Sequence, residues 1–392
     1  MKDKYRIYFY TDTFLPAVDG VVTSMLNFKK ELERRGHEVY IVTPGSRETK
    51  ELAVVHDHII MVPGVKFRRY PQYRLTVAPF LAAMKADLND ADIIHLQTPF
   101  FMGMYGLLLA KMYKTPLVGS FHTLFTNRNV IKEYASTSRL THKILTKYAW
   151  PYARFFYNKC DSVIAPSGSV KELLDKRGIG NVSVVPNGVD TSRFNPRLKG
   201  KDLRERFMGS DDEHMVLYLG RLSAEKNIET LIGAARMLKG KPIRFVIAGT
   251  GPAHRKYEAM VRRYGLKRVT FTGFVPDAEL PKYYAAADLF CMPSTFETQG
   301  IVALEAMACN RPVVGADYMA LSELIRNGVN GEKFAPKDGR SCARKIEKVI
   351  NNIDSYKGMT VTADAYSVRR TTERLLQVYG TTLDNRVNNH TS

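Results

Sequence analysis

Short apolar runs rich in Val, Ile and Tyr alternate with helix-like segments along almost the whole chain, and this alternation limits the possible folds most. The run RIYFYT at 6–11 precedes an amphipathic segment at 20–38, and a second run, VYIVTP, follows at 39–44. Strand–helix–strand repeats predict parallel sheets with helices on both faces. Two later runs, VIAPS and FVIAG, are apolar on both sides, which is typical of fully buried parallel strands. The sequence therefore predicts an α/β protein.

The alternation occurs in two series, which indicates two domains. The series are separated near VPNGVDTSRFNP at 185–196, where Pro and Gly lie close together. A chain of 392 residues is too long for one ordinary core and fits two domains of about 100–200 residues each. We predict two doubly wound, Rossmann-like domains facing each other across a cleft, at 1–187 and 188–364. A C-terminal helix at about 365–385 is expected to pack back on the first domain.

The composition limits the partners and the compartment. A net charge of +19 predicts attraction to a nucleotide, a nucleic acid or an acidic membrane surface. The N-terminal residues lead directly into a strand pattern rather than a signal peptide, and no stretch reaches the roughly 18 uninterrupted apolar residues of a spanning helix. The four cysteines are widely spaced, which indicates neither a disulfide framework nor a zinc site and fits a reducing cytosol. They are Cys160, Cys291, Cys309 and Cys342.

Basic side chains follow the strand predicted at 216–220, VLYLG. Gly220 ends the run, and Arg221 and Lys226 come soon after it. Glycine lets a ligand approach the backbone, arginine offers a two-pronged donor to phosphate oxygens, and lysine offers a point charge. Because ligands of open α/β sheets bind beyond the carboxyl ends of the strands, these residues predict a diphosphate clamp. The alternative is a solvated basic loop.

Two glutamates, Glu297 and Glu305, flank the start of a helix predicted at 300–308, GIVALEAMA. The first N–H groups of such a helix are unpaired donors at the positive end of its dipole, and they suit a phosphate. Glu305 lies among small apolar residues, which indicates a buried position. Burial of a carboxylate costs free energy unless the group has a partner. We expect it to accept hydrogen bonds from ribose hydroxyls, and Glu297 to accept them from sugar hydroxyls.

Other roles for the two glutamates remain open. They could be the acid and the nucleophile of a glycosidase, and Glu305 could form a salt bridge on the helix face. A glycosidase has no use for a diphosphate clamp, so the clamp favours two separate grips on one nucleotide sugar.

Further strand ends carry weaker candidates. Asp19 and Gly20 precede a helix, so free N–H groups could face an anion there, although an ordinary N-cap has the same pattern. His122 follows the predicted strand LVGSF and could contact a ligand or be purely structural. The loops containing Gly249 and Gly251 could present backbone to a nucleobase. No G-x-G-x-x-G with a following ribose-binding acid occurs, which argues against a nicotinamide or flavin cofactor.

These motifs, taken in order, resemble one family. The E-x7-E pattern, preceded by GRLSAEKN at 220–227, resembles the retaining glycosyltransferases of family 4, which have the two-domain GT-B fold. TDTFLPAVDGVVTS at 11–24 is similar to their N-terminal glycine loop, with Asp19 where many members have a first glycine. SFHT at 120–123 is similar to their histidine motif, and VPNGVDTSRF at 185–194 to their interdomain junction. The resemblance covers nearly the whole chain, and the ordered set is highly specific.

The resemblance implies roles for the matching residues. Arg221 and Lys226 would hold the donor diphosphate, with Gly20 near it. Glu305 would bind the ribose, and Glu297 the hydroxyls of the donor sugar. Front-face substitution would retain the anomeric configuration. Such enzymes are generally metal-independent, so we expect no cofactor and no metal, with positive side chains in the place of the metal.

The same resemblance implies contacts with the rest of the donor. Val275 would present its backbone to the base, and His122 would lie by the outer hydroxyls of the sugar. The backbone of the segment ahead of and into the predicted helix would meet phosphate and sugar, at Thr298, Gln299, Gly300, Ile301 and Val302.

The segment 139–160 combines basic and aromatic side chains, which is typical of a membrane-interface helix. The residues expected to bind the membrane or the acceptor are Lys143, Lys147, Trp150 and Arg154. Leu140, Ile144, Tyr148 and Tyr152 form an apolar stripe beside them. VKFRRYPQYRL at 65–75 adds a second basic and aromatic patch in a predicted loop. The alternative is that the stripe packs on the sheet and the lysines are only solvated.

The acceptor follows from these patches and from the resemblance. The motifs look especially like the branch of diacylglycerol glucosyltransferases and phosphatidylinositol mannosyltransferases. We therefore expect a UDP- or GDP-sugar donor, a lipid acceptor and a cytoplasmic enzyme bound peripherally to the inner face of the cell membrane. A polyprenyl-linked or soluble acceptor, a nucleotide-sugar 2-epimerase and a non-catalytic binding subunit are the alternatives. No motif supports nucleic-acid binding.

Overall fold

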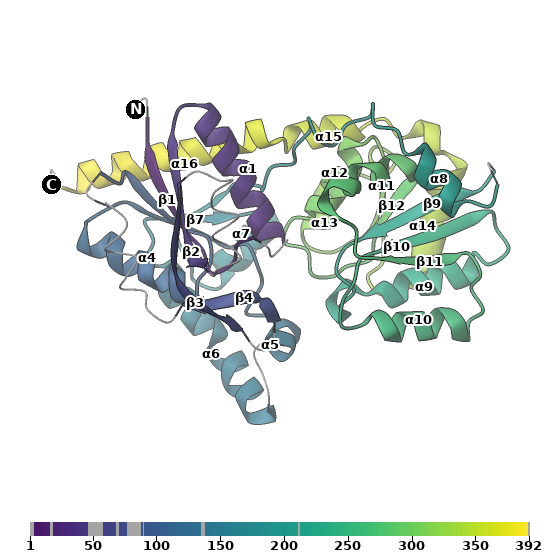
Figure 1. Ribbon diagram of the computed structural model, residues 1–392, viewed down its shortest axis with the longest axis horizontal. Coiled ribbons are helices and arrows are strands. Elements are labelled where there is room, and N and C mark those ends of the chain that lie inside the picture. The colour runs from purple at the N-terminus through teal and green to yellow at the C-terminus, as the bar shows by residue number, and fades with distance from the viewer. Residues whose placement is uncertain are drawn as a thin grey trace. The chain divides into compact units, whose positions relative to one another are not determined.

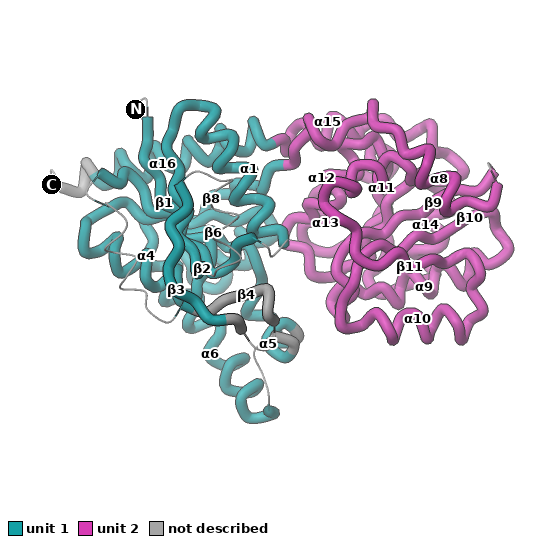
Figure 2. Tube along the Cα trace, viewed as in Figure 1, with its two compact units in different colours: residues 1–188, 368–392 teal, residues 189–367 magenta. Residues whose placement is uncertain are grey.

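The computed structural model describes residues 4–15, 19–45, 58–67, 70–76, 88, 90–134, 138–210 and 212–390. The chain divides into two compact units (Figure 2). Unit 1 comprises 1–188 and 368–392, and unit 2 comprises 189–367. The chain leaves unit 1 within the Pro- and Gly-containing segment and returns where the long helix α16, Val368–His390, begins.

Within the described residues, unit 1 contains an eight-stranded sheet in the order β4-β3-β2-β1-β5-β6-β7-β8. The strands are β1 Arg6–Tyr10, β2 Glu38–Gly45, β3 Ile59–Phe67, β4 Tyr70–Thr76, β5 Ile93–Leu96, β6 Leu117–Ser120, β7 Ser162–Ala165 and β8 Val182–Val184. Neighbouring strands run parallel except β3 and β4, which are antiparallel. The loop predicted at 65–75 is therefore wrong, because most of that segment pairs in β3 and β4 at the sheet edge.

Helices cover both faces of this sheet (Figure 1). They are α1 Gly20–Arg34, α4 Phe101–Met112, α5 Arg128–Tyr134, α6 Arg139–Tyr157, α7 Gly168–Lys176 and α16. α1 and α16 pack together, and their apolar side chains share one core with β1. His95 in β5 fastens α16 to the sheet, because its ring nitrogens lie 2.7 Å from the Tyr379 hydroxyl and 2.8 Å from the Ser120 hydroxyl.

Unit 2 is a parallel sheet in the order β11-β10-β9-β12-β13-β14, enclosed by helices. The strands are β9 His214–Leu219, β10 Ile243–Ala248, β11 Val269–Gly273, β12 Leu289–Met292, β13 Val313–Ala316 and β14 Gly331–Phe334. The helices are α8 Lys201–Phe207, α9 Ile228–Met237, α10 His254–Arg263, α11 Leu280–Ala286, α12 Ile301–Ala308, α13 Ala320–Leu324, α14 Gly339–Asn351 and α15 Met359–Ala365. The predicted α/β class, with two Rossmann-like sheets, is confirmed.

The strand order of unit 2 indicates where a ligand is expected to bind. β9 pairs with β10 on one side and with β12 on the other, so the winding reverses between β9 and β12. Ligands of doubly wound sheets bind beyond the carboxyl ends of the strands at such a switch point. The two loops that leave the sheet there contain Arg221 and Lys226 after β9, and Glu297 after β12.

None of the described helices is both long enough and apolar enough to cross a bilayer.

Candidate active site

The loops that follow β9 and β12 meet in an ion pair. Lys226 ends the short 3-10 helix η1, Ala224–Lys226, and its Nζ lies 2.6 Å from Oε1 of Glu297. The two residues are 71 positions apart in the sequence. The lysine side chain is 22% exposed and the glutamate side chain 11%, so the pair is less screened than a surface pair would be. Two predicted site residues are thus in direct contact.

The Arg221 loop lies directly on the loop that follows β10. A Cβ on Gly249, whose φ is +131°, would lie 2.0 Å from the Gly220 carbonyl oxygen, and a Cβ on Gly251 would lie 2.3 Å from the Leu222 oxygen. Both positions therefore require glycine for packing. These glycines support the basic loop, and a contact of their backbone with a nucleobase stays a prediction. The carbonyl of Arg221 also accepts a 3.1 Å hydrogen bond from Tyr218.

Helix α12 starts at the same end of the sheet. Gly300 has a φ of +88°, a left-handed conformation that favours glycine, and a Cβ there would lie 3.1 Å from Leu321 Cδ2. The N-cap residue of this helix is Gly300 itself, which has no side chain to cap it. The N–H groups at Ile301 and Val302 belong to its first turn, where an anion is stabilised by the helix dipole. This arrangement fits the predicted phosphate contact.

Glu305 lies one turn further along α12 and is only 7% exposed. Tyr284 in α11 donates a 2.7 Å hydrogen bond to its Oε2. Burial raises the pKa of the Glu305 carboxyl to about 7, although the Tyr284 hydrogen bond and the charge of Arg193 oppose the shift. The buried position predicted for this carboxylate is confirmed. Its hydrogen-bond partner is a tyrosine and not a cation, which disfavours the helix-face salt bridge.

Val275 follows β11 and is buried, while the neighbouring Phe274 ring is exposed. Thr298 and Gln299 occupy the loop before α12, and the Gln299 side chain is buried.

In unit 1, the start of α1 differs from the anion site that the sequence suggested. Asp19 is the N-cap, and its Oδ1 accepts hydrogen bonds from the N–H groups of Val21 at 2.9 Å and Val22 at 3.0 Å. These two donors are therefore engaged by the chain's own carboxylate, and the ordinary N-cap is what the structure shows. Gly20 is the first residue of α1, and its place near a diphosphate stays a prediction.

His122 lies just beyond β6 and is held by a residue after β5. Its Nε2 is 2.8 Å from Oε1 of Gln97. Burial lowers the pKa of the His122 imidazole to about 4, so the ring is neutral at neutral pH. Because the Gln97 oxygen can only accept, Nε2 carries the ring hydrogen. A neutral, oriented imidazole suits a contact with sugar hydroxyls.

Comparisons with known proteins identify the family. A model described as Glycosyltransferase Family 4 matches residues 18–193, and one described as Glycosyl transferases group 1 matches residues 201–364. The alpha-monoglucosyldiacylglycerol synthase of Streptococcus pneumoniae is 33% identical, over 84% of this chain and 75% of that protein. The chain belongs to the family 4 glycosyltransferases.

Other relatives support the same assignment. The GDP-mannose-dependent alpha-mannosyltransferase of Corynebacterium glutamicum is 31% identical to this glycosyltransferase, over 83% of this chain and 76% of its own length. Among solved structures, HepE of Anabaena, in complex with UDP and glucose, superimposes with a TM-score of 0.75 at 21% identity, covering 96% of this chain and 100% of HepE. That likeness shows the GT-B fold.

Sequence analysis missed two residues that contact or adjoin predicted site residues of the glycosyltransferase, one in each unit. Asn227 donates from Nδ2 to the Thr295 hydroxyl at 2.7 Å, beside the Lys226–Glu297 ion pair. Its φ of +50° is one that asparagine tolerates, and this asparagine directly before a helix was the available signal. Gln97, which holds His122, could have been recognised from its position immediately after a strand.

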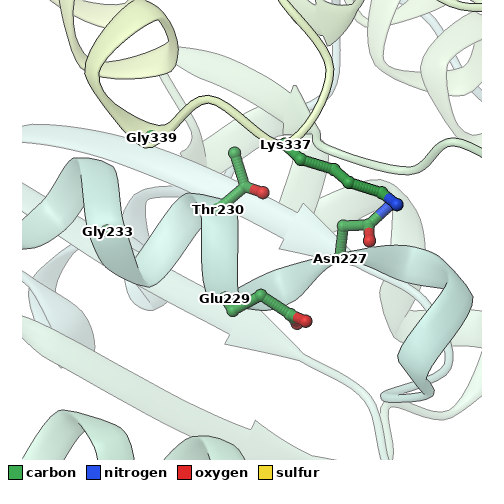
Figure 3. A pocket seen from close by; sticks show the side chains of 6 residues that line it. All are labelled: Asn227, Glu229, Thr230, Gly233, Lys337 and Gly339. Carbon is green, nitrogen blue, oxygen red and sulfur yellow. The ribbon is translucent and has the colours of Figure 1, made fainter.

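A pocket of about 260 Å³ adjoins Asn227 in the glycosyltransferase (Figure 3). In Figure 3 the Lys337 side chain extends towards Asn227. The pocket is lined by Asn227, Glu229, Thr230, Gly233, Lys337 and Gly339.

The basic and aromatic helix of the glycosyltransferase, α6, is largely uncovered in its N-terminal part, which extends away from the unit 1 sheet in Figure 1. Leu140, Ile144 and Tyr148 are 68%, 47% and 55% exposed, and Lys143, Lys147 and Arg154 are exposed as well. The apolar stripe therefore does not pack on the sheet over these three residues.

Two aromatic members of the predicted surface differ from this picture. Trp150 stacks on Phe121 with ring centroids 6.4 Å apart, and the Arg177 guanidinium lies 4.7 Å from its ring centroid. The Tyr152 hydroxyl donates to the Pro99 carbonyl. The Trp150 ring therefore contacts other residues of unit 1, and its place at the membrane or the acceptor stays a prediction.

Proposed function

We propose that the enzyme transfers a hexose, with retention of configuration, from a UDP- or GDP-sugar to a hydroxyl of a membrane lipid such as a diacylglycerol-type glycerolipid. The Lys226–Glu297 ion pair at the β9–β12 switch point carries the donor part of this proposal. The pair offers a cation for the diphosphate next to a carboxylate for sugar hydroxyls, in the loop that leads to the start of α12.

The proposed chemistry uses the chain's own charges. The bond between the anomeric carbon and the diphosphate oxygen breaks, and the acceptor oxygen bonds to the same face of the oxocarbenium-like sugar. The departing phosphate oxygen takes the proton of the acceptor hydroxyl, so atoms and charges balance without a protein base. Arg221, Lys226 and the α12 N-terminus stabilise the negative charge that develops on the leaving diphosphate. The proposed mechanism requires no metal ion.

Donor binding is expected to depend on pH through Glu305. The carboxyl is protonated below its pKa of about 7 and then has one fewer acceptor for ribose hydroxyls. The donor dissociation constant should therefore fall as the pH rises through about 7. Isothermal titration calorimetry across this range measures it. The side chain of Glu305→Gln cannot ionise, so the pH dependence of donor affinity should disappear in this variant. If the variant keeps the pH dependence of the wild type, the proposed role of Glu305 is wrong.

The same pKa shift acts on stability. The native carboxyl keeps its proton up to a pH of about 7, whereas the ordinary value is 4.5. The native state therefore binds more protons between these two values, and this residue's contribution to the free energy of unfolding declines as the pH rises through that window.

Exposed apolar surface in unit 1 supports a lipid acceptor. Besides the α6 stripe, α4 presents an exposed apolar row, and such rows mark membrane or protein interaction sites. The row consists of Phe101, Met104, Leu108 and Met112. α4 and α6 are neighbours, since a Cβ on Gly103 would lie 3.0 Å from the Phe156 ring. Two of the most similar relatives are named alpha-monoglucosyldiacylglycerol synthases. We propose peripheral binding to the inner face of the cell membrane through this surface.

Reversing two charges on α6 should separate membrane binding from donor binding. Lys143→Glu combined with Lys147→Glu is expected to weaken binding to anionic vesicles about tenfold or more, because each cation near such a surface contributes about 1 kcal/mol. Vesicle co-sedimentation measures the loss, and donor affinity should stay unchanged. The matched control is Lys199→Glu with Lys201→Glu, two exposed lysines of unit 2. Equal losses in both pairs would show a general charge effect and remove α6 from the membrane surface.

The donor and the acceptor are tested in sequence. Thermal unfolding is measured with UDP-glucose, UDP-galactose, UDP-N-acetylglucosamine, GDP-mannose and ADP-glucose, each with and without anionic vesicles. A donor that stabilises the protein is then incubated with diacylglycerol in vesicles, and the anomeric configuration of the product is read by NMR. Transfer to a soluble sugar alone would replace the lipid acceptor, and an inverted product would reject retention. Epimerised nucleotide sugar would support the epimerase instead.

A further inference from the structure

A second pocket, of about 540 Å³, lies at α5 and α6 in unit 1. Its volume is in the range of small-molecule sites. It is lined by Arg128, Arg139, His142, Lys143, Thr146 and Lys147. Arg128 comes from the first turn of α5, and the other residues come from the exposed part of α6.

All four charged side chains that line the pocket are positive. Arg139, Lys143 and Lys147 are spaced four residues apart and therefore share one face of α6, and Arg128 adds a fourth cation from α5. Among the side chains that the structure describes, no carboxylate forms an ion pair with any of these four cations. Arginine matches phosphate geometry with two parallel hydrogen bonds. Such a group of cations is complementary to a multiply charged anion.

Two buried polar atoms on the same helix lack a partner. The Nδ1 of His142 and the hydroxyl of Thr146 are buried and make no hydrogen bond within the described part of the protein. Both residues line the pocket, and both can donate a hydrogen bond, the histidine in the tautomer that carries its hydrogen on Nδ1. Buried polar groups normally have a hydrogen-bond partner. Oxygens of a ligand in the pocket would supply the acceptors that His142 and Thr146 lack.

We propose that this pocket binds a phosphate group, with the cations balancing its charge and His142 and Thr146 donating to its oxygens. A carboxylate has one charge and two oxygens, and a phosphate matches four cations and two neutral donors better. The proposal goes beyond the glycosyl transfer, because it concerns a binding site in unit 1 and holds whichever acceptor the enzyme uses.

The phosphate can come from a lipid headgroup or from a soluble phosphate ester. The exposed Leu140, Ile144 and Tyr148 lie on the adjoining side of α6, where acyl chains would cover them if a lipid supplies the phosphate. Both sources present the same phosphate oxygens to the pocket. They differ in whether binding requires a bilayer.

The test compares charge-matched variants of the full chain. The pocket variant is Arg128→Gln with Lys143→Gln, and the control variant is Lys132→Gln with Lys159→Gln, which removes two exposed cations near the same helices but outside the pocket. Thr146→Val removes one donor without changing the charge. The probes are inorganic phosphate, glycerol 3-phosphate, and phosphatidylcholine vesicles with and without phosphatidic acid. The local readout is the NMR shift of the His142 ring, which separates this pocket from the donor clamp.

The pocket variant should bind its phosphate probe at least about tenfold more weakly than the control variant, and Thr146→Val should lose several-fold at unchanged charge. Loss confined to vesicles that contain phosphatidic acid, shared by Thr146→Val and accompanied by a shift of the His142 ring in the unsubstituted protein, supports the site with a lipid source. Loss for the soluble phosphates supports it with a soluble source. Equal weakening in the pocket and control variants, with no response of the His142 ring to any probe, would overturn the proposal. Circular dichroism checks that every variant is folded.

Discussion

Replacing Arg221 or Lys226 with alanine is expected to lower turnover by roughly 10²–10³-fold, which is typical for the loss of one group that stabilises a developing negative charge. Both residues follow β9 at the switch point, and Lys226 also holds Glu297 at 2.6 Å. Without the lysine, Glu297 would keep an unpaired charge in a partly buried site and would repel the diphosphate. The measurement is the turnover number at saturating donor, together with donor affinity by calorimetry.

A matched control separates this effect from the loss of any lysine–glutamate pair. Lys256 and Glu229 form a pair at 3.6 Å outside the proposed donor contacts, with the lysine side chain 58% exposed. Lys256→Ala should leave turnover unchanged. A second comparison uses Glu297→Gln, which keeps the hydrogen-bonding capacity for sugar hydroxyls but removes the charge, and should fall between wild type and Lys226→Ala. Near-normal turnover in both Arg221→Ala and Lys226→Ala would reject the diphosphate clamp.

Gly249→Ala is expected to reduce the free energy of unfolding by about 3 kcal/mol, through backbone strain and overpacking together. Its φ is +131°, and the added methyl carbon would lie 2.0 Å from the Gly220 carbonyl oxygen. The backbone at 220–222 must then move, so donor affinity should fall together with stability. Urea unfolding measures the first effect, and calorimetry with the donor measures the second.

Gly240 provides the control for the strain component. It also has a positive φ, +96°, but a Cβ there would have nothing within 4 Å. Gly240→Ala should therefore cost about 1 kcal/mol and leave donor affinity intact. If Gly249→Ala and Gly240→Ala destabilise equally, the close approach to Gly220 has no energetic consequence, and the proposed support of the basic loop is wrong.

Local patterns in the sequence predicted the elements of the fold well. The apolar runs at 6–11 and 39–44 are strands, and 20–38 forms a helix over most of its length, because side-chain periodicity is a local property. The buried carboxylate of Glu305 was also predictable, since the residues around it are small and apolar. The loop predicted at 65–75 was wrong because strand pairing depends on a partner strand, and the basic composition of this segment resembles that of a loop.

Asp19 and Trp150 both show that residue type alone does not determine the contacts of a side chain. An acidic N-cap and an anion site share the pattern of a short polar residue before a helix, and only the 2.9 Å contact from Val21 to the Asp19 carboxylate distinguishes them. A tryptophan in a basic helix suggests a membrane anchor, but the structure adds contacts with Phe121 and Arg177, which lie far from Trp150 in the sequence.

The α/β class, the two series of strands and helices, and the residue types of the predicted donor site follow from the amino-acid sequence alone, because they depend on periodicity and on motifs along the chain. Which of those residues touch depends on how the chain folds in space. Lys226 and Glu297 meet because β9 and β12 are neighbours in the sheet although 71 residues separate the two side chains. Likewise, the exposure of α6 depends on what packs against it, and Gly249 must be glycine because another loop lies within 2.0 Å of its missing Cβ. Such proximity follows from strand order and packing, which no local pattern contains.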